Sequence, residues 1–493
     1  MKKIIIFFLV SFVLGVCYAI KEPDKGTKIS NSVEEAMDWL KENTSSTTTT
    51  PTVLTTQAPT ATTNTSITVT QEVVLNTNTQ YHYRGFLVDD NGKVLVYNEN
   101  DKRMITDEYA ECLGNVLDGY NSQLGLDKEF EEKLRSPCPS DHGNSYRTEN
   151  GYPIGQSLEL TLDADLQKSI YDYMKNHNII GSTTILLGEG AVKVLVSYPS
   201  YNANNDLADQ TLQPHACYNR CVEAAIPGST FKILSSVVAA DYGITEYYDP
   251  GYIHEFDVSN WDVKDKKTYT TPIKRSLREA FRLSSNCWFS QLFYENGSNK
   301  VTESLDKYFS YSTPIHTDFG DLRNEINLSS NSALARAGFG QREHMSPLYT
   351  AMCSNAVITG ELNVPFISKK TIDTVTWKDI SELNTGKNTI STIPANLTHE
   401  VKLGMIDVAC DLDLTVDRQG VKIYSKTGTA EIDKNSKDIH YIVVTLSDAA
   451  NKPENTTTIV FQYLNSDKEF ASGDRDHMQA ILNMVYEKEE NKS

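Results

Sequence analysis

Three short motifs could together carry out nucleophilic chemistry on a carbonyl group. In chain order they are Ser229-Thr-Phe-Lys232, Ser284-Ser-Asn286 and Lys426-Thr-Gly-Thr429. A serine hydroxyl is a weak nucleophile at neutral pH and needs a base within hydrogen-bond reach. Each motif alone is common in a chain rich in Ser, Asn and Lys, but the three in this order are far more specific. They predict a serine acyl-transfer site.

The spacing of the first motif supplies the base. Ser229 and Lys232 stand at positions i and i+3, so one helical turn places the amine beside the hydroxyl. Pro227 and Gly228 open a helix that is apolar nearly all round up to Gly243, which predicts a helix inside the core. Burial would lower the pKa of Lys232 toward that of a usable base. Without the other motifs, a core helix with a snorkelling lysine would be the simpler interpretation.

The third motif should end a strand of a sheet. Residues 421–425 read as a strand leading into Lys426, and two further strand-like segments follow at 439–446 and 456–463. A strand end is therefore favoured over a hairpin tip. Gly428 has no side chain where a substrate backbone would lie against the strand edge. The second motif falls between two helical patterns, at 273–283 and 287–294.

The remaining periodicity predicts helices packed on a sheet. A helical stripe starts after Asp163, a good N-cap. Residues 183–187 and 191–198 read as a hairpin, and an amphipathic helix around 478–485 closes the chain. Two strands early and three late predict an α+β fold with one sheet built from both ends of the chain.

Taken together, these segments resemble a class B penicillin-binding protein, a D,D-transpeptidase of bacterial peptidoglycan synthesis. The likeness extends over roughly residues 81–490. Besides the three motifs, it rests on Gly155–Asp163 with Leu166-Gln167, on Val192–Tyr201, on Asn219-Arg220 before Ile226–Lys232, and on Gly338-Phe-Gly-Gln341 with Ser346-Pro-Leu348.

The resemblance implies a fold in more detail than the pattern does. It implies a five-stranded antiparallel sheet flanked by helices, with an inserted all-helical subdomain and a small N-terminal pedestal region. On this basis residues 81–154 form the pedestal region and residues 155–493 the penicillin-binding transpeptidase domain. No region of glycosyltransferase size precedes the transpeptidase part, which favours class B over a bifunctional enzyme.

The expected reaction assigns a role to each motif residue. Ser229 attacks the carbonyl of a D-alanyl-D-alanine stem peptide, and Lys232 takes its proton. Ser284, held by Lys232 and Lys426, relays a proton to the leaving amine, and Asn286 binds the substrate backbone. The resemblance further implies that Thr427 and Thr429 hold the terminal carboxylate beside Gly428, and that the N–H groups of Ser229 and Thr429 form the oxyanion hole.

Composition limits the partners. The net charge of −19 over 493 residues argues against nucleic acid, which requires a basic face. The expected partners are peptidoglycan stem peptides, β-lactam antibiotics and a glycan-polymerising membrane protein. We expect no metal and no organic cofactor. His215, Cys217 and Cys221 could suggest zinc, but the fourth ligand is missing and the spacing is loose. Disulfide pairing among the eight cysteines cannot be deduced from sequence.

The N-terminal residues predict export. Met1-Lys-Lys precedes an apolar run at residues 4–20, which fits a signal-anchor or a signal peptide over 1–20, and we favour the anchor. The catalytic domain should lie on the extracytoplasmic face of the membrane, or be secreted if cleavage follows Ala19. Residues 21–43 contain a short amphipathic helix, and 44–80 form a Thr-rich disordered linker, with 14 Thr in residues 44–70.

Two other classes of function remain open. A D,D-carboxypeptidase or a serine β-lactamase would use the same site with water in place of the acceptor amine. The long span from Ser229 to Lys426 argues against a compact lactamase. A non-catalytic β-lactam sensor or scaffold of cell-wall synthesis would not need an intact nucleophile, base and relay.

Overall fold

The computed structural model describes residues 82–100, 102–118, 125–140, 148, 151–254, 262–265, 271–384, 386–431, 437–465 and 472–490. The predicted signal segment 1–20, the amphipathic helix in 21–43 and the linker 44–80 lie outside these residues. Within the described ranges, no helix has both the length and the apolar character needed to cross a bilayer. The chain divides into two compact units.

Unit 1 comprises the described residues of 82–106, together with 131–158 and 371–380. It holds β1, β2 and β3 entirely and the residues of β4, β16 and β17 that fall in these ranges, in a sheet with the order β17-β16-β4-β1-β2-β3; the helix α5 (Glu131–Leu134) also belongs to it. Phe86, Val88, Val94 and Tyr97 form a small apolar core with Met104 and Trp377. The strands are β1 (Leu87–Val88), β2 (Val94–Glu99), β3 (Lys102–Ile105), β4 (Ser157–Leu160), β16 (Ser368–Ile372) and β17 (Asp379–Glu382).

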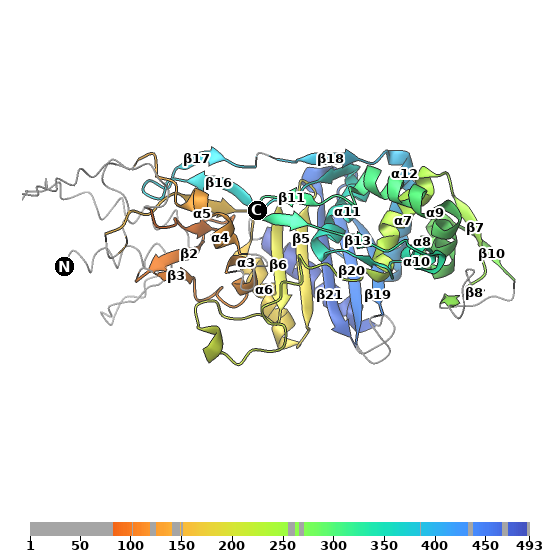
Figure 1. The fold of residues 1–493 in the computed structure, drawn as a ribbon, viewed down its shortest axis with the longest axis horizontal. Coiled ribbons are helices and arrows are strands. Elements are labelled where there is room, and N and C mark those ends of the chain that lie inside the picture. The colour runs from red at the N-terminus through yellow and green to blue at the C-terminus, as the bar shows by residue number, and fades with distance from the viewer. Residues whose placement is uncertain are drawn as a thin grey trace, which may run out of the picture. The chain divides into compact units, whose positions relative to one another are not determined.

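Unit 2 contains the five-stranded antiparallel sheet that the family resemblance implied. Its order is β19-β20-β21-β5-β6, and the strands lie side by side in Figure 1. The sheet joins both ends of the chain, because β5 pairs with β21 through Ile185 and Ile459. The strands are β5 (Gly181–Leu187), β6 (Val192–Tyr198), β19 (Lys422–Ala430), β20 (Asp438–Ser447) and β21 (Thr457–Asn465).

Helices cover the two faces of this sheet. Side chains alternate along a strand, so Thr458 and Phe461 of β21 point to opposite faces. The Thr458 hydroxyl donates to Asn355 of α11 (Pro347–Thr359) over 2.6 Å, whereas the Phe461 ring contacts His477 of α13 (Ser472–Glu490). The helix α6 (Ala164–Asn176) packs beside α13. Asp163 caps α6, as predicted, by accepting from the Leu166 N–H.

The segment between β6 and β19 corrects one detail of the predicted fold. It is rich in helix but not all-helical, because five pairs of short strands also form there. The periodicity was misleading at Ile273–Ser276, which is strand β10 and not the start of a helix. It pairs with β7 (Glu246–Asp249), a partner distant in sequence, and α8 begins only at Leu277 behind a Ser276–Glu279 capping box.

The helices of this segment are α7 (Lys232–Asp241), α8 (Leu277–Arg282), α9 (Asn286–Phe309), α10 (Asn331–Ala337), α11 and α12 (Ala395–Asp411). Its other strand pairs are β8 (Tyr252–His254) with β9 (Asp262–Lys264), β11 (Ile315–Thr317) with β12 (Gly320–Leu322), β13 (Glu325–Ile326) with β14 (Glu343–His344), and β15 (Glu361–Asn363) with β18 (Thr389–Thr392). Two short helices, α3 (Gly114–Leu117) and α4 (Leu126–Glu129), precede the sheet in unit 2.

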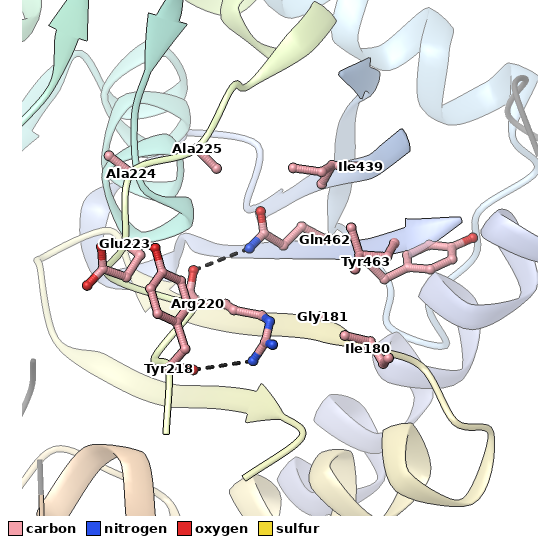
Figure 2. Close-up of a pocket in the computed structure, with 11 residues that line it drawn as sticks. Ile180, Gly181, Tyr218, Arg220, Glu223, Ala224, Ala225, Ile439, Gln462 and Tyr463 are labelled. Atoms are coloured by element: carbon pink, nitrogen blue, oxygen red, sulfur yellow. Dashed lines mark hydrogen bonds between the residues drawn. The ribbon is translucent and has the colours of Figure 1, made fainter. Parts of the chain in front are cut away.

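A pocket of about 150 Å³ lies where β20 begins and β21 ends (Figure 2). Its floor comes from the strands, at Ile439, Gln462 and Gly181, and its opposite wall from residues 218–225. That wall leads along the chain directly to Pro227 and the first motif.

Candidate active site

The predicted nucleophile, Ser229, lies on a tight turn that enters a buried helix. Ser229 belongs to a 3-10 turn, Gly228–Phe231, which runs directly into α7 at Lys232. Gly228 has φ +54°, and a Cβ there would meet the Thr429 carbonyl oxygen at 2.6 Å. Only glycine fits this approach without strain. The turn therefore holds the Ser229 backbone directly against β19.

Lys232 is fully buried and converges on three motif residues. Its Nζ donates to Ser229 Oγ at 2.9 Å, to the Ser284 carbonyl oxygen at 2.8 Å, to Ser284 Oγ at 3.1 Å and to Asn286 Oδ1 at 2.8 Å. An ammonium has three donors for these four acceptors. One contact is therefore in excess of what a protonated lysine can satisfy at once.

Burial lowers the pKa of Lys232 to about 7, because the low-dielectric surroundings penalise the ammonium. The carboxylate of Asp265 acts in the opposite direction and is the largest influence raising this pKa. A lysine with this pKa is about half neutral at pH 7, whereas an ordinary lysine is only about 0.03% neutral. The neutral amine has a lone pair that can accept the Ser229 proton.

Ser284 lies between two lysines. Its Oγ accepts from Lys232 Nζ and from Lys426 Nζ, both at 3.1 Å. Its backbone is in the left-handed region, at φ +54°, which a residue with a side chain adopts at a cost. Because both lysines donate, the Ser284 hydroxyl proton is free to point toward a third group in the site.

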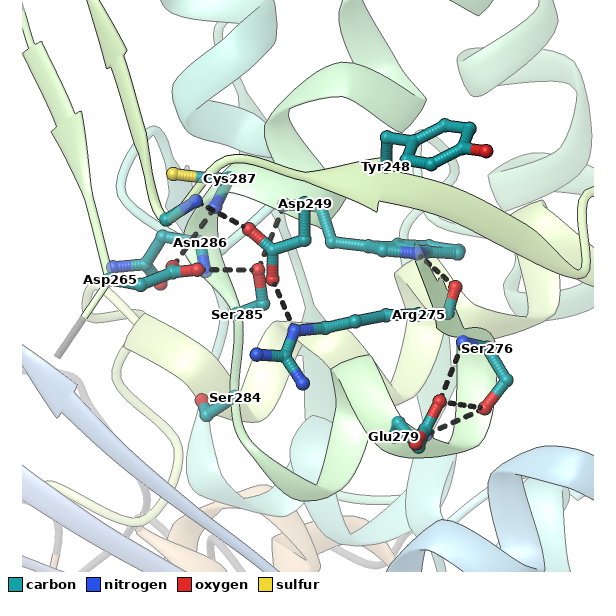
Figure 3. A network of polar contacts seen from close by, with 12 residues as sticks. Tyr248, Asp249, Asp265, Arg275, Ser276, Glu279, Ser284, Ser285, Asn286 and Cys287 are labelled. Atoms are coloured by element: carbon teal, nitrogen blue, oxygen red, sulfur yellow. Dashed lines mark hydrogen bonds and ion pairs between the residues drawn. The ribbon is translucent and has the colours of Figure 1, made fainter. Parts of the chain in front are cut away.

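Asp265, which the sequence analysis did not select, fixes the second motif (Figure 3). Its Oδ1 accepts the backbone N–H of Asn286 at 2.5 Å and of Cys287 at 3.2 Å, and its Oδ2 accepts from Ser285 Oγ at 2.8 Å. A carboxylate at the first turn of α9 is favoured by the helix dipole. No motif marks this aspartate, because it lies on the hairpin end after β9, 20 residues before Ser285.

The same hairpin orients Asn286. The Asn286 side chain donates through Nδ2 to the Lys264 carbonyl oxygen at 3.0 Å and accepts through Oδ1 from Lys232. Both ends of this amide are therefore assigned by their partners. Asn286 is held in one orientation beside Lys232.

On distance alone, one metal ion could be bound by Asp249, Asp265 and Cys287 together. Their atoms already have other partners, since Arg275 Nε donates to Asp249 at 2.9 Å and the Asp265 oxygens cap α9 (Figure 3). Burial also raises the pKa of the Cys287 thiol well above its usual range. Asp249 therefore serves in an ion pair with Arg275, and Asp265 serves as a cap of α9.

The third motif lies within β19, at the edge of the sheet. Lys426 is buried, and its Nζ donates to the Thr427 carbonyl oxygen at 2.8 Å and contacts the Phe281 ring face at 5.5 Å. Gly428 packs against the turn Gly228–Phe231, where an added Cβ would meet Thr230 at 3.0 Å. Thr427 and Thr429 alternate with these buried positions and are half-buried.

Gln341 and Gly340 close the site beside β19. The Gln341 side chain donates to the Thr429 carbonyl oxygen at 3.3 Å. Gly340 has φ +87°, and a Cβ there would lie 1.8 Å from the Gly228 carbonyl oxygen. The structure thus brings Ser229, Lys232, Ser284, Asn286 and Lys426 into one hydrogen-bonded network, with Thr427, Gly428 and Thr429 beside it.

Comparison with known proteins identifies the family. The family described as "Penicillin binding protein transpeptidase domain" matches residues 185–486, which is more than half of the chain. The chain belongs to this family of penicillin-binding proteins. Penicillin-binding protein 3 of Bacillus subtilis is 26% identical over 344 residues, covering 64% of this chain and 49% of that protein. Peptidoglycan D,D-transpeptidase PbpA of Mycobacterium tuberculosis is 24% identical over 316 residues, covering 57% of this chain and 61% of that protein.

Solved structures support the fold of this penicillin-binding protein. The ceftriaxone acyl-enzyme complex of penicillin-binding protein A from M. tuberculosis has a TM-score of 0.69 at 20% identity, covering 83% of this chain and 99% of that one. The named relatives agree with class B, as the resemblance implied. The chain spans about half the length of the curated relatives that it matches.

The cysteines of this penicillin-binding protein are free thiols at all seven described positions. Cys221 is buried and donates to the Val196 carbonyl oxygen at 3.1 Å, which is a packing role. His215 and Cys217 are absent from the groups of described residues that could hold a metal ion.

Proposed function

We propose that this chain is a serine D,D-transpeptidase that cross-links peptidoglycan stem peptides through an acyl-enzyme on Ser229. The observation that carries the proposal is the 2.9 Å contact between Lys232 Nζ and Ser229 Oγ in a fully buried setting. The family supports the reaction class, because one relative is itself named a peptidoglycan D,D-transpeptidase.

In the first step, Ser229 Oγ bonds to the carbonyl carbon of the penultimate D-alanine while its proton moves to Lys232. The peptide C–N bond then breaks, and the leaving D-alanine amine needs a proton. Ser284 supplies that proton from its hydroxyl and recovers one from Lys232, since its Oγ is 3.1 Å from Nζ. Lys426 keeps Ser284 in position from the other side.

In the second step, the amine of a neighbouring stem peptide attacks the acyl-enzyme, and the proton transfers run in reverse. The N–H groups of Ser229 and Thr429 stabilise the oxyanion in both steps. Asn286 binds the substrate backbone, and the hydroxyls of Thr427 and Thr429 hold the terminal carboxylate. Gly428 keeps the strand edge open to that backbone. Penicillins acylate the same serine.

The test is covalent labelling with a fluorescent penicillin. Ser229→Ala should abolish the label, because Ser229 is the proposed nucleophile, whereas Ser284, the other hydroxyl beside Lys232, is assigned to the proton relay. Ser236→Ala is the matched control, since Ser236 lies on α7, the helix that follows the Ser229 turn, and its hydroxyl donates to the Lys232 carbonyl oxygen and not to the proposed catalytic groups. A labelled Ser229→Ala protein with native circular dichroism would overturn the assignment. Label lost over hours supports a transpeptidase, and turnover within seconds supports a β-lactamase.

We also propose that the catalytic domain lies on the extracytoplasmic face of the membrane. The apolar run at 4–20 and the Thr-rich segment 44–80 support this location. Protease added to intact spheroplasts should cut within 44–80 and release an active fragment. If the chain is cut only after lysis, together with a cytoplasmic marker, the proposal fails. A glycan-polymerising membrane protein is the proposed partner, testable by co-purification in mild detergent.

A further inference from the structure

The pocket at the end of the sheet, called here the strand-end pocket, is not used by the proposed reaction. Its wall ends at Ala225, four residues before the nucleophile, and its floor includes Ile439, which pairs with Ala430 directly after the third motif. Ala225 is tied to Met345 by a backbone bridge. The pocket therefore adjoins the catalytic segments through their own backbones.

Arg220 brings a positive charge to this pocket, and within the described residues its guanidinium forms no ion pair. Its guanidinium donates to neutral acceptors: Ser197 Oγ at 3.2 Å and the carbonyl oxygens of Tyr218 at 3.3 Å and His215 at 3.4 Å. The Tyr218 ring adds a cation–π contact at 5.9 Å. Desolvation lowers the pKa of Arg220, which is the effect of burial on a cation that lacks an anionic partner.

Gln462 contributes an acceptor with no donor. Its side chain is only 5% exposed, and its Nε2 donates to the Arg220 carbonyl oxygen at 3.3 Å. Its Oε1 has no hydrogen-bond partner in the described part of the chain, and Figure 2 shows this oxygen pointing toward the space between Ala225 and Ile439. A buried carbonyl oxygen without a donor is unfavourable, and a ligand N–H would satisfy it.

Glu223 completes a wall of mixed charge. One of its oxygens accepts from the Tyr218 hydroxyl at 3.2 Å. A carboxylate on the wall disfavours a simple anion such as phosphate, whereas Arg220 disfavours a simple amine. A ligand that carries both a carboxylate and an ammonium meets the two charges and also supplies a donor for Gln462.

We propose that the strand-end pocket binds the zwitterionic group of an α-amino acid, with its carboxylate on Arg220 and its ammonium on Gln462 Oε1. The group comes either from a free amino acid or, resting on the proposed function, from the acceptor peptide. Binding itself does not depend on catalysis, so the two proposals can fail separately.

The test titrates the purified full chain after penicillin acylation, which occupies the catalytic cleft and is verified by mass. The probes are D-alanine, D-lactate without the ammonium, and D-alaninamide without the carboxylate, followed by calorimetry or ligand-observed NMR. D-Alanine should bind at least tenfold more tightly than either analogue. Equal affinities for all three probes, or no binding of D-alanine, would overturn the proposal. If penicillin does not acylate the chain, the same titration of the unmodified protein still decides the matter.

Variants locate the binding. Ala224 is exposed at the pocket and makes no side-chain hydrogen bond, so Ala224→Trp fills the space without removing a contact. It should weaken D-alanine binding at least tenfold, while Ala449→Trp, at an exposed site on the turn after β20, should change it less than twofold. Arg220→Gln should make D-alanine no better than D-alaninamide. Unchanged D-alanine binding by Ala224→Trp would refute the site even if Arg220→Gln does not fold.

Kinetics with a peptide acceptor show whether the bound zwitterionic group belongs to the acceptor peptide or to a free amino acid. If the acceptor supplies it, Ala224→Trp raises the acceptor KM at least tenfold and leaves the penicillin acylation rate within twofold of wild type. If a free amino acid supplies it, the acceptor KM stays constant although D-alanine binding is lost.

Discussion

The pH dependence of acylation is the most direct measure of whether Lys232 is the base. Only the neutral amine can accept the Ser229 proton, so the acylation rate follows the deprotonated fraction of Lys232. With a pKa of about 7, that fraction is roughly 1% at pH 5, half at pH 7 and nearly complete at pH 9. The rate should therefore rise about tenfold per pH unit from pH 5 to pH 6.5 and level off above pH 8.

The assay is stopped-flow acylation by a fluorescent penicillin in overlapping buffers of constant ionic strength, with the uncatalysed hydrolysis subtracted. A lysine with its ordinary pKa near 10.5 would give a rate still rising tenfold per unit at pH 9. That result would refute the argument from burial, and a flat profile from pH 5 to pH 8 would refute Lys232 as the base. Lys232→Arg keeps the charge but cannot deprotonate, so acylation should fall on the order of 10²–10⁴-fold.

Two further perturbations address the supports of the site. Asp265→Asn removes the charge that raises the Lys232 pKa, so the acylation profile should move to lower pH by on the order of 0.5–1 unit, equivalent to about 0.7–1.4 kcal/mol. The control is Asp411→Asn, which changes an exposed partner of Arg282. Equal acylation profiles for the two variants would contradict the role of Asp265. Gly340→Ala should lower the unfolding free energy by on the order of 2–5 kcal/mol in urea titrations, because left-handed strain adds to a clash with the Gly228 carbonyl. Gly420→Ala, also at positive φ but with nothing within 4 Å, should cost only about 1–2 kcal/mol, and similar losses in the two variants would exclude the clash.

The sequence was informative where the chemistry depends on local spacing. Ser229 and Lys232 meet because a helical turn brings i and i+3 together, and Lys426 to Thr429 follow a strand whose neighbours were readable. The alternation of β5, β6, β20 and β21 was equally local. These features require no knowledge of distant partners.

The sequence was uninformative where a residue acts through a distant partner. Asp265 supports the second motif only because the β8–β9 hairpin folds back onto α9. Ile273–Ser276 has apolar spacing compatible with a helix, yet pairing with β7 makes it a strand. The strand-end pocket likewise depends on Gln462 meeting the Arg220 carbonyl across 242 positions of sequence.

The pairing of β5 with β21 has a consequence for biosynthesis. Leu187 and Thr457 are register partners, so the hairpin β5–β6 is made about 270 residues before the strand that completes its sheet. At a translation rate of about 5–20 residues per second, its inner edge waits roughly 15–50 s for that partner. An unpaired strand rich in apolar residues is a template for aggregation. The nascent chain should therefore depend on a holding factor until β21 arrives, and a transcript truncated before β21 should yield insoluble protein.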